Sequence, residues 1–151
     1  MPAALVEQAL AALAAHPAAS IATVAGPVRS REEYRDPNVV KVVLDAQARA
    51  LLFSRAPLPW WRDGSAKGST ALPQDPAALR HVGLYAYRAG FVSRYAAWPP
   101  CPLEKIEALE QLRVLWHGEK IIMHETHTKP QAGVDTPEDL ERVRLLLAPA
   151  H

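Results

Sequence analysis

The sequence predicts an α/β fold, in which strands alternate with helices in a single domain over residues 1–151. Three observations lead to this prediction. Residues 38–44 (NVVKVVL) are rich in β-branched residues, which is typical of a buried strand. Residues 81–87 alternate between polar and apolar side chains, which indicates a strand with two different faces. Apolar residues recur at helical spacing over 3–15 and 103–116.

The first elements follow from local signals. We expect a helix over residues 3–15, because Leu5, Ala9 and Leu13 share one face and Pro17 ends the pattern. Residues 20–28 (SIATVAGPV) predict a strand that ends at a Gly-Pro pair. After the buried strand at 38–44, a short strand begins at residue 50 and leads into a proline-stiffened loop near residue 60.

The second half of the chain continues the alternation. Residues 62–79 have no periodicity and predict a mobile surface loop, and the two-faced strand follows at 81–87. A short helical turn is expected near 89–95, then a helix over 103–116 that stops at Gly118, then a strand over 120–126. The last helix would begin at Thr136, a good N-cap residue that is followed by a proline.

Bulk properties exclude several classes of protein. The formal net charge is +1, which gives no strong field for nucleic acid or an anionic membrane. A single cysteine, Cys101, cannot form an internal disulfide, which favours a reducing compartment such as the cytoplasm. No apolar run approaches the length of a membrane span, and the first residues lack the basic start of a signal peptide.

Asp135 is a candidate metal ligand, because it directly precedes the start of the last predicted helix. A carboxylate held there and open to a cleft suits Mg²⁺, which binds one or two carboxylates together with phosphate oxygens. The alternative, which spacing alone favours, is a solvated acid near the positive end of a helix dipole.

Other polar residues suit a small anionic or hydroxylated ligand. Arg55 sits where a strand leaves the sheet, and its planar fork suits a carboxylate or phosphate, although a surface salt bridge explains it equally well. His81 and Tyr85 project from the same side of their strand, about 13 Å apart along it. Either would hydrogen-bond a sugar hydroxyl, or be satisfied locally beneath a helix. Glu110 and Gln111 lie on the helix expected to cover them, together with Glu107, and acids there are usually solvated.

Three further signals are weaker. The run His124-Glu125-Thr126-His127 lacks the spacing of two histidines one helical turn apart, so it does not predict a zinc site. Cys101 lies between prolines with no positioned base, which argues against a nucleophile. The pair Trp60-Trp61 would stack a base, but beside prolines it more often indicates a packed loop or a subunit contact.

Four blocks of the sequence together resemble the 3-deoxy-manno-octulosonate cytidylyltransferases, or CMP-Kdo synthetases. They are DPNVVKVVLDAQARALLFSRAPLPWWRD (36–63), RHVGLYAYRAGFVSRY (80–95), PLEKIEALEQLRVLWHGEKI (102–121) and GVDTPEDLERVR (133–144). The resemblance implies a nucleotidyltransferase-like mixed sheet with flanking helices, a homodimer, and Mg²⁺ as cofactor. It implies that CTP and the sugar acid Kdo react to give CMP-Kdo and pyrophosphate for lipopolysaccharide synthesis.

The resemblance also implies roles for single residues. Arg55 would meet the Kdo carboxylate, and Asp135 would be a catalytic Mg²⁺ ligand. The Kdo hydroxyls would be held by His81, Tyr85, Glu110 and Gln111.

The 151 residues contain neither the basic glycine-containing phosphate loop nor the QGDEP-type block of the family. The chain therefore resembles the C-terminal three-fifths of such an enzyme, without its N-terminal nucleotide-binding strands. We expect it to be inactive alone, and to have an exposed sheet edge. The alternative is a non-catalytic remnant that dimerises or binds the sugar acid.

Overall fold

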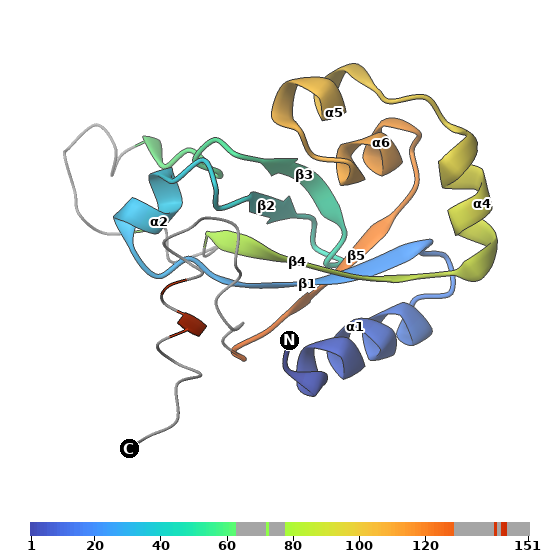
Figure 1. Cartoon of the computed structure of the whole chain (residues 1–151), viewed down its shortest axis with the longest axis horizontal. Helices are drawn as coiled ribbons and strands as arrows, with labels where there is room; N and C mark the ends of the chain where they lie inside the picture. Colours follow the sequence, from blue (N-terminus) through green and yellow to red (C-terminus); the bar gives the residue numbers. More distant parts are fainter. Residues whose placement is uncertain (63–71, 73–77, 129–140, 142, 145–151) are drawn as a thin grey trace.

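Five strands form one mixed sheet in the order β3-β2-β4-β1-β5 in the computed structural model (Figure 1). The structure describes residues 1–62, 72, 78–128, 141, 143 and 144. Strand β1 runs parallel to β5, and the other neighbouring strands are antiparallel. The strands are β1 (Ile21–Pro27), β2 (Lys41–Leu44), β3 (Ala50–Ser54), β4 (Leu79–Tyr87) and β5 (Ile121–Glu125). The helices are α1 (Ala3–Ala15), α2 (Arg31–Arg35), α4 (Ala89–Ala97), α5 (Pro102–Glu107) and α6 (Gln111–Trp116). The predicted α/β class is confirmed.

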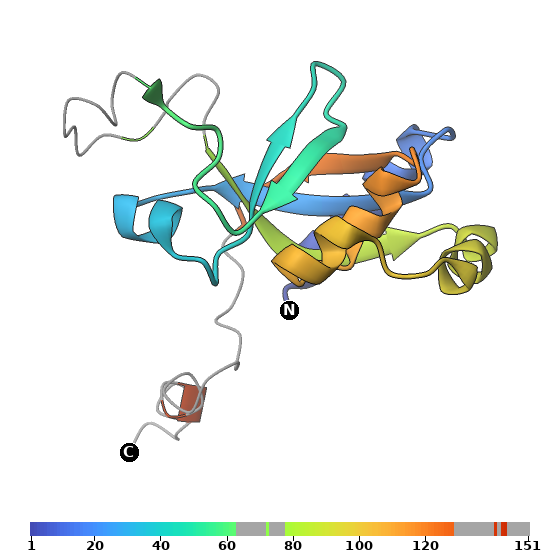
Figure 2. The same ribbon diagram turned by 90° about the horizontal axis from the view of Figure 1, so that it is seen from above.

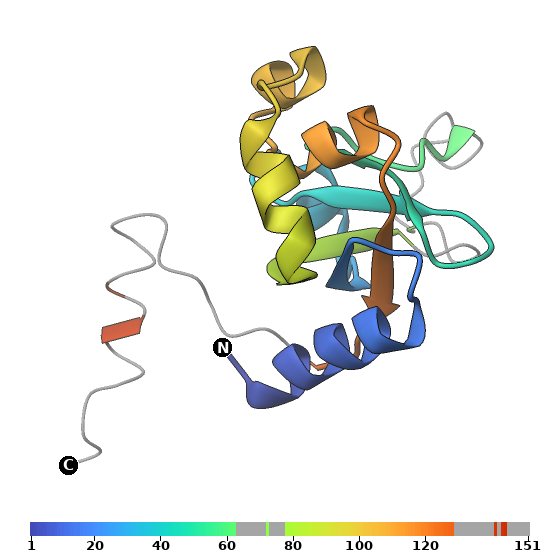
Figure 3. The same cartoon turned by 90° about the vertical axis from the view of Figure 1, so that its right-hand side faces the viewer.

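Helix α1 covers one face of the sheet (Figure 3). Its buried residues recur at the spacing that the sequence predicts, and the helix ends just before Pro17. It packs on the apolar face of β4, where Val82, Leu84 and Ala86 join the same cluster. The predicted split of β4 into an apolar and a polar face is therefore confirmed for its apolar side.

Helices α4, α5 and α6 lie on the opposite side, and Figure 2 shows α5 and α6 over the sheet. The core between them contains alternate residues of the central strands, such as Ile21 and Ala25 of β1, with Phe53 of β3 and Leu112 of α6. The polar face of β4 turns toward this side, where His81 meets Phe53 with ring centroids 5.0 Å apart. This layer carries the candidate site.

The single helix expected over 103–116 is in fact two, and that prediction is wrong. Ala108 adopts a left-handed conformation with φ of 52°, which ends α5, and α6 begins at Gln111. A capping box at Cys101 starts α5, and the half-buried ion pair between Glu104 and Arg113 links α5 to α6. Apolar spacing continues across the break, so periodicity alone did not reveal it.

Helix α2 was not predicted either. Ser30 caps it by accepting a hydrogen bond from the Glu33 backbone N–H at 3.1 Å, while the Glu33 carboxylate accepts from the Arg29 N–H at 2.7 Å. The Ser-x-x-Glu spacing was the signal in the sequence.

The turn between β2 and β3 contacts β5, the strand at the opposite edge of the sheet. The Met123 N–H of β5 donates to the Ala48 carbonyl at 2.8 Å, and Arg49 pairs with Ile122 in an isolated bridge. The edge of β5 is thus partly covered, which moderates the expectation of an exposed edge. No helix among the described residues is long and apolar enough to cross a membrane.

Candidate functional site

A bulge in β4 shapes the polar face of the sheet. Opposite β1, Thr23 pairs with Tyr85 but Ala25 pairs with His81, so four steps of β4 match two of β1. Gly83 lies within this bulge with φ of 77°, a conformation that favours glycine. The His81 and Tyr85 rings lie only 5.1 Å apart between centroids. The expected separation of about 13 Å is therefore wrong for these side chains, because it assumed a regular strand.

His81 is fixed by the fully buried Thr23 on the neighbouring strand. The Thr23 hydroxyl donates to the Leu84 carbonyl at 2.5 Å and lies 2.8 Å from His81 Nε2. Because the hydroxyl proton is used on Leu84, the Nε2–H of His81 must be the donor to Thr23. Burial lowers the pKa of His81 to about 4. The ring is therefore neutral at pH 7, and Nδ1 is available as an acceptor.

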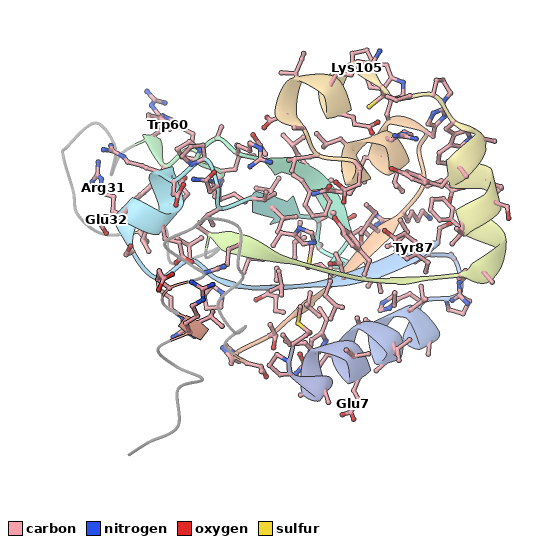
Figure 4. All side chains as sticks on the ribbon, in the orientation of Figure 1. Glu7, Arg31, Glu32, Trp60, Tyr87 and Lys105 are labelled. Carbon is pink, nitrogen blue, oxygen red and sulfur yellow. The ribbon has the colours of Figure 1, made fainter. Side chains whose placement is uncertain are left out.

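An aromatic strip continues from His81 along β4 onto α4. Tyr85 lies 5.7 Å from Tyr87, and Tyr87 stacks on Phe91 at 6.4 Å, between ring centroids. Tyr87 is 44% exposed and lies between the sheet and α4 (Figure 4). Burial raises the pKa of Tyr85 and of Tyr87, and the Glu110 carboxylate raises both further. These phenols are neutral hydrogen-bond donors on the side where Glu110 lies.

The junction between α5 and α6 places Glu110 near this strip, and Gln111 follows as the first residue of α6. Glu110 is exposed, and its backbone carbonyl accepts a hydrogen bond from the Tyr95 hydroxyl at 3.2 Å. Gln111 is only 4% exposed, and its Oε1 has no hydrogen-bond partner among the described residues. A buried acceptor without a partner costs ~1–3 kcal/mol, so a ligand hydroxyl that donated to it would recover this cost.

Arg55 reaches the same junction from β3. Its Nε donates to the Glu107 carbonyl at 2.7 Å, Nη2 to the Ala108 carbonyl at 3.4 Å, and Nη1 to the Pro37 carbonyl at 2.9 Å. No described carboxylate forms a salt bridge with this guanidinium. One N–H on each terminal nitrogen remains, so the positive charge is held in place without being neutralised.

Glu107 completes the support of Arg55. Its carboxylate accepts hydrogen bonds from the Ser54 hydroxyl at 2.6 Å and the Arg55 backbone N–H at 2.9 Å. The expectation that Glu107 is a solvated helix acid is therefore wrong. No local pattern indicates these contacts, because the partner residues lie over fifty positions away in the sequence.

The structure brings most predicted site residues together. Arg55 binds the carbonyls that lead into the α5–α6 junction, Glu110 and Gln111 follow there, and Glu110 acts on Tyr85 beside His81. Asp135 lies outside the described residues, as do most of the predicted last helix and of the loop at 62–79. Their predictions are untested.

The weaker signals do not produce sites. No group of three or more possible metal ligands exists in the described part of the chain, and His124 and Glu125 lie on β5. Cys101 is buried, and its Sγ caps α5 by accepting from the Glu104 N–H at 3.4 Å. Trp60 is 65% exposed, so it is not packed against its loop, and the alternative of a subunit contact stays a prediction.

Comparison with known proteins places the chain in a family. A family model described as "Cytidylyltransferase" matches residues 1–121. A 3-deoxy-manno-octulosonate cytidylyltransferase of Leptothrix cholodnii is 63% identical over 124 residues, which are 82% of this chain and 45% of that protein. The enzyme of the same name from Methylibium petroleiphilum is 56% identical over 147 residues, covering 95% of this chain and 55% of the relative.

The chain is also similar to a solved structure. It is that of CMP:2-keto-3-deoxy-manno-octonic acid synthetase complexed with CTP, with a TM-score of 0.77 and 38% identity. The match covers 93% of this chain and 54% of that one. The chain thus spans about half the length of the proteins it matches.

Proposed function

The chain belongs to the cytidylyltransferase family, a family of nucleotidyltransferases, and on this premise we propose that it carries the sugar-acid half of a 3-deoxy-manno-octulosonate cytidylyltransferase site. The reaction would join CTP and Kdo to give CMP-Kdo and pyrophosphate, in the cytoplasm, for lipopolysaccharide synthesis. The proposal is supported by the placement of Arg55 and Glu110 at the α5–α6 junction, with Glu110 close enough to act on Tyr85 beside His81.

Arg55 would hold the carboxylate of Kdo. Its two remaining N–H groups lie on different terminal nitrogens, and a carboxylate matches such a fork with two charge-assisted hydrogen bonds. Because no described carboxylate neutralises the guanidinium, an incoming anion would not have to displace an internal partner.

The hydroxyl groups of the sugar would meet a mixed set of donors and acceptors. Neutral His81 offers Nδ1 as an acceptor, and Tyr85 offers its phenol as a donor. Glu110 offers its exposed carboxylate, and Gln111 offers the unpartnered Oε1. Held in this way, the sugar would present its anomeric oxygen to the α-phosphorus of CTP, where an O–P bond forms as the bond to pyrophosphate breaks.

Mg²⁺ remains part of the proposal through Asp135, which lies outside the described residues. When bound, the metal would neutralise charge on the triphosphate. The described residues would bind and orient the sugar.

We expect the isolated chain to bind Kdo but to turn over slowly or not at all, since its 151 residues contain no phosphate loop. Pyrophosphate release with CTP, Kdo and Mg²⁺ measures turnover, and a rate equal to that of a relative of full length would contradict this expectation. Kdo binding without turnover would match the alternative of a sugar-binding remnant. The proposed homodimer is tested by sedimentation of the same sample.

Titration calorimetry with Kdo tests the sugar site itself. We expect Arg55→Ala to weaken Kdo binding by at least about tenfold, because a lost charge-assisted hydrogen bond costs ~1.5–3 kcal/mol. Arg62→Ala is the matched control, since Arg62 is exposed and lies outside the site. Urea unfolding of both variants shows whether each stays folded. Equal affinity of Arg55→Ala and the parent would refute the role of Arg55.

A further inference from the structure

Lys41 is a fully buried lysine in β2, with 0% of its surface exposed. Its Nζ donates to the Asp36 carbonyl at 2.8 Å and also to the Val39 carbonyl. No described carboxylate forms an ion pair with it. Lysine is almost never fully buried unless it is paired. An apolar side chain would suit a strand interior better, so the ammonium group calls for a specific explanation.

The two carbonyls that bind Lys41 belong to one short loop, residues 36–39. The carbonyl of Pro37, between them, accepts the hydrogen bond from Arg55 Nη1 at 2.9 Å. Lys41 and Arg55 therefore hold the same loop, from inside the sheet and from the site respectively. Without the ammonium group, two carbonyls of this loop would lose their hydrogen-bond donor, which would favour movement of the loop.

The two cations are also close enough to influence each other. Burial lowers the pKa of Lys41, the Asp36 carboxylate raises it, and the Arg55 guanidinium lowers it. Glu107 and Glu33 raise the pKa of Lys41 as well, so its surroundings contain both signs of charge. An anion bound at Arg55 would lie in the field of both cations, although only Arg55 would touch it.

We infer that Lys41 is a positioning residue for the substrate carboxylate: it fixes loop 36–39, which fixes the Arg55 guanidinium. This inference rests on the proposed function. It assigns to Lys41 a part in recognising the acid group of the sugar, and none in binding its hydroxyls. The distinction between these two roles makes the inference testable.

The first test compares Kdo with its amide, in which a neutral carboxamide replaces the carboxylate. We expect the parent to prefer the acid, and Lys41→Met to lose about tenfold in affinity for Kdo while its affinity for the amide stays the same. The double variant with Arg55→Ala should bind Kdo no more weakly than Arg55→Ala alone. If Lys41→Met weakens both ligands equally, weakens neither, or adds its full effect to that of Arg55→Ala, the inference is wrong.

Stability is controlled with a truncation on the other face of the sheet. Leu5→Ala removes a fully buried side chain beneath α1 and should cost ~3 kcal/mol of stability without changing the preference for acid over amide. Lys41→Gln keeps one amide donor for the loop. If Lys41→Met does not fold, the affinities for Kdo and for its amide are compared in Lys41→Gln instead.

A second measurement needs no sugar. In the parent, the carbonyls of Glu107, Ala108 and Pro37 should slow rotation of the Arg55 guanidinium, which NMR line shapes of the terminal nitrogens report. Lys41→Met should speed this rotation, and Leu5→Ala should not. If the parent does not distinguish Kdo from its amide, the proposed function fails. In that case the rotation rate of the Arg55 guanidinium is the only test of the role of Lys41, and an unchanged rate in Lys41→Met would overturn this role.

Discussion

His81 should make the stability of the protein depend on pH in a defined window. Its pKa is about 4 in the folded chain and 6.5 in its ordinary state. Between these values the unfolded chain binds more protons, so the free energy of unfolding rises with pH. The contribution of His81 is complete above pH 6.5 and is lost as the pH falls to about 4. One pKa unit corresponds to ~1.4 kcal/mol, so the full effect is about 2–3 kcal/mol once partial exposure of the ring is allowed for.

The assay is urea unfolding followed by tryptophan fluorescence at a series of pH values from 4 to 7.5. His81→Gln keeps an N–H that can donate to Thr23 but cannot titrate, so the parent should lose about 2–3 kcal/mol more than this variant across the window. Other acids also titrate at low pH, and the difference between the two proteins removes their effect. His127→Gln, at an exposed position, should follow the parent. Parallel curves for the parent and His81→Gln would refute the argument from burial.

Two further predictions concern stability. Gly83→Ala should cost ~1–2 kcal/mol of stability, because its φ of 77° is strained for alanine even though nothing crowds the added Cβ. Gly90→Ala within α4 should be neutral or stabilising. Equal urea midpoints for the two variants would contradict this prediction. Arg113→Met should cost ~3 kcal/mol of stability, because it leaves the half-buried Glu104 unpaired. Arg144→Met should cost only ~0–0.5 kcal/mol, because the pair of Arg144 with Glu141 is exposed. Similar losses in the two variants would show that burial does not decide the strength of these ion pairs.

Strong local patterns predicted most of the described elements. The buried face of α1 and the two faces of β4 followed from spacing alone, because each element buries one face against a single neighbouring layer. The predictions failed where the backbone departs from a regular repeat. Ala108 and Gly83 both adopt positive φ, and neither the α5–α6 break nor the β4 bulge changes the apolar pattern around it. Only the folded chain reveals such local departures, and both lie at the candidate site.

In the candidate site, the residues that would face a ligand could be predicted, whereas the residues that hold them in place could not. Arg55, His81 and Tyr85 could be proposed from their places on predicted strands, and the family resemblance added Glu110 and Gln111. The residues that hold them, Lys41, Thr23 and Glu107, could not. A lysine within NVVKVVL and a threonine within IATVAGP have no visible partner, since their partners are backbone carbonyls and distant side chains.

This supporting layer predicts that sugar binding and turnover can be separated experimentally. Arg55 is held by carbonyls of loop 36–39 and of the α5–α6 junction, and His81 by β1, all within the described part of the chain. Neither anchor requires a group from a nucleotide-binding half, so the geometry for the sugar would be preorganised before any nucleotide arrives. A chain with this layer intact should therefore recognise the sugar acid whatever supplies the nucleotide. Loss of binding in Arg55→Ala, with turnover absent throughout, would be the expected pattern.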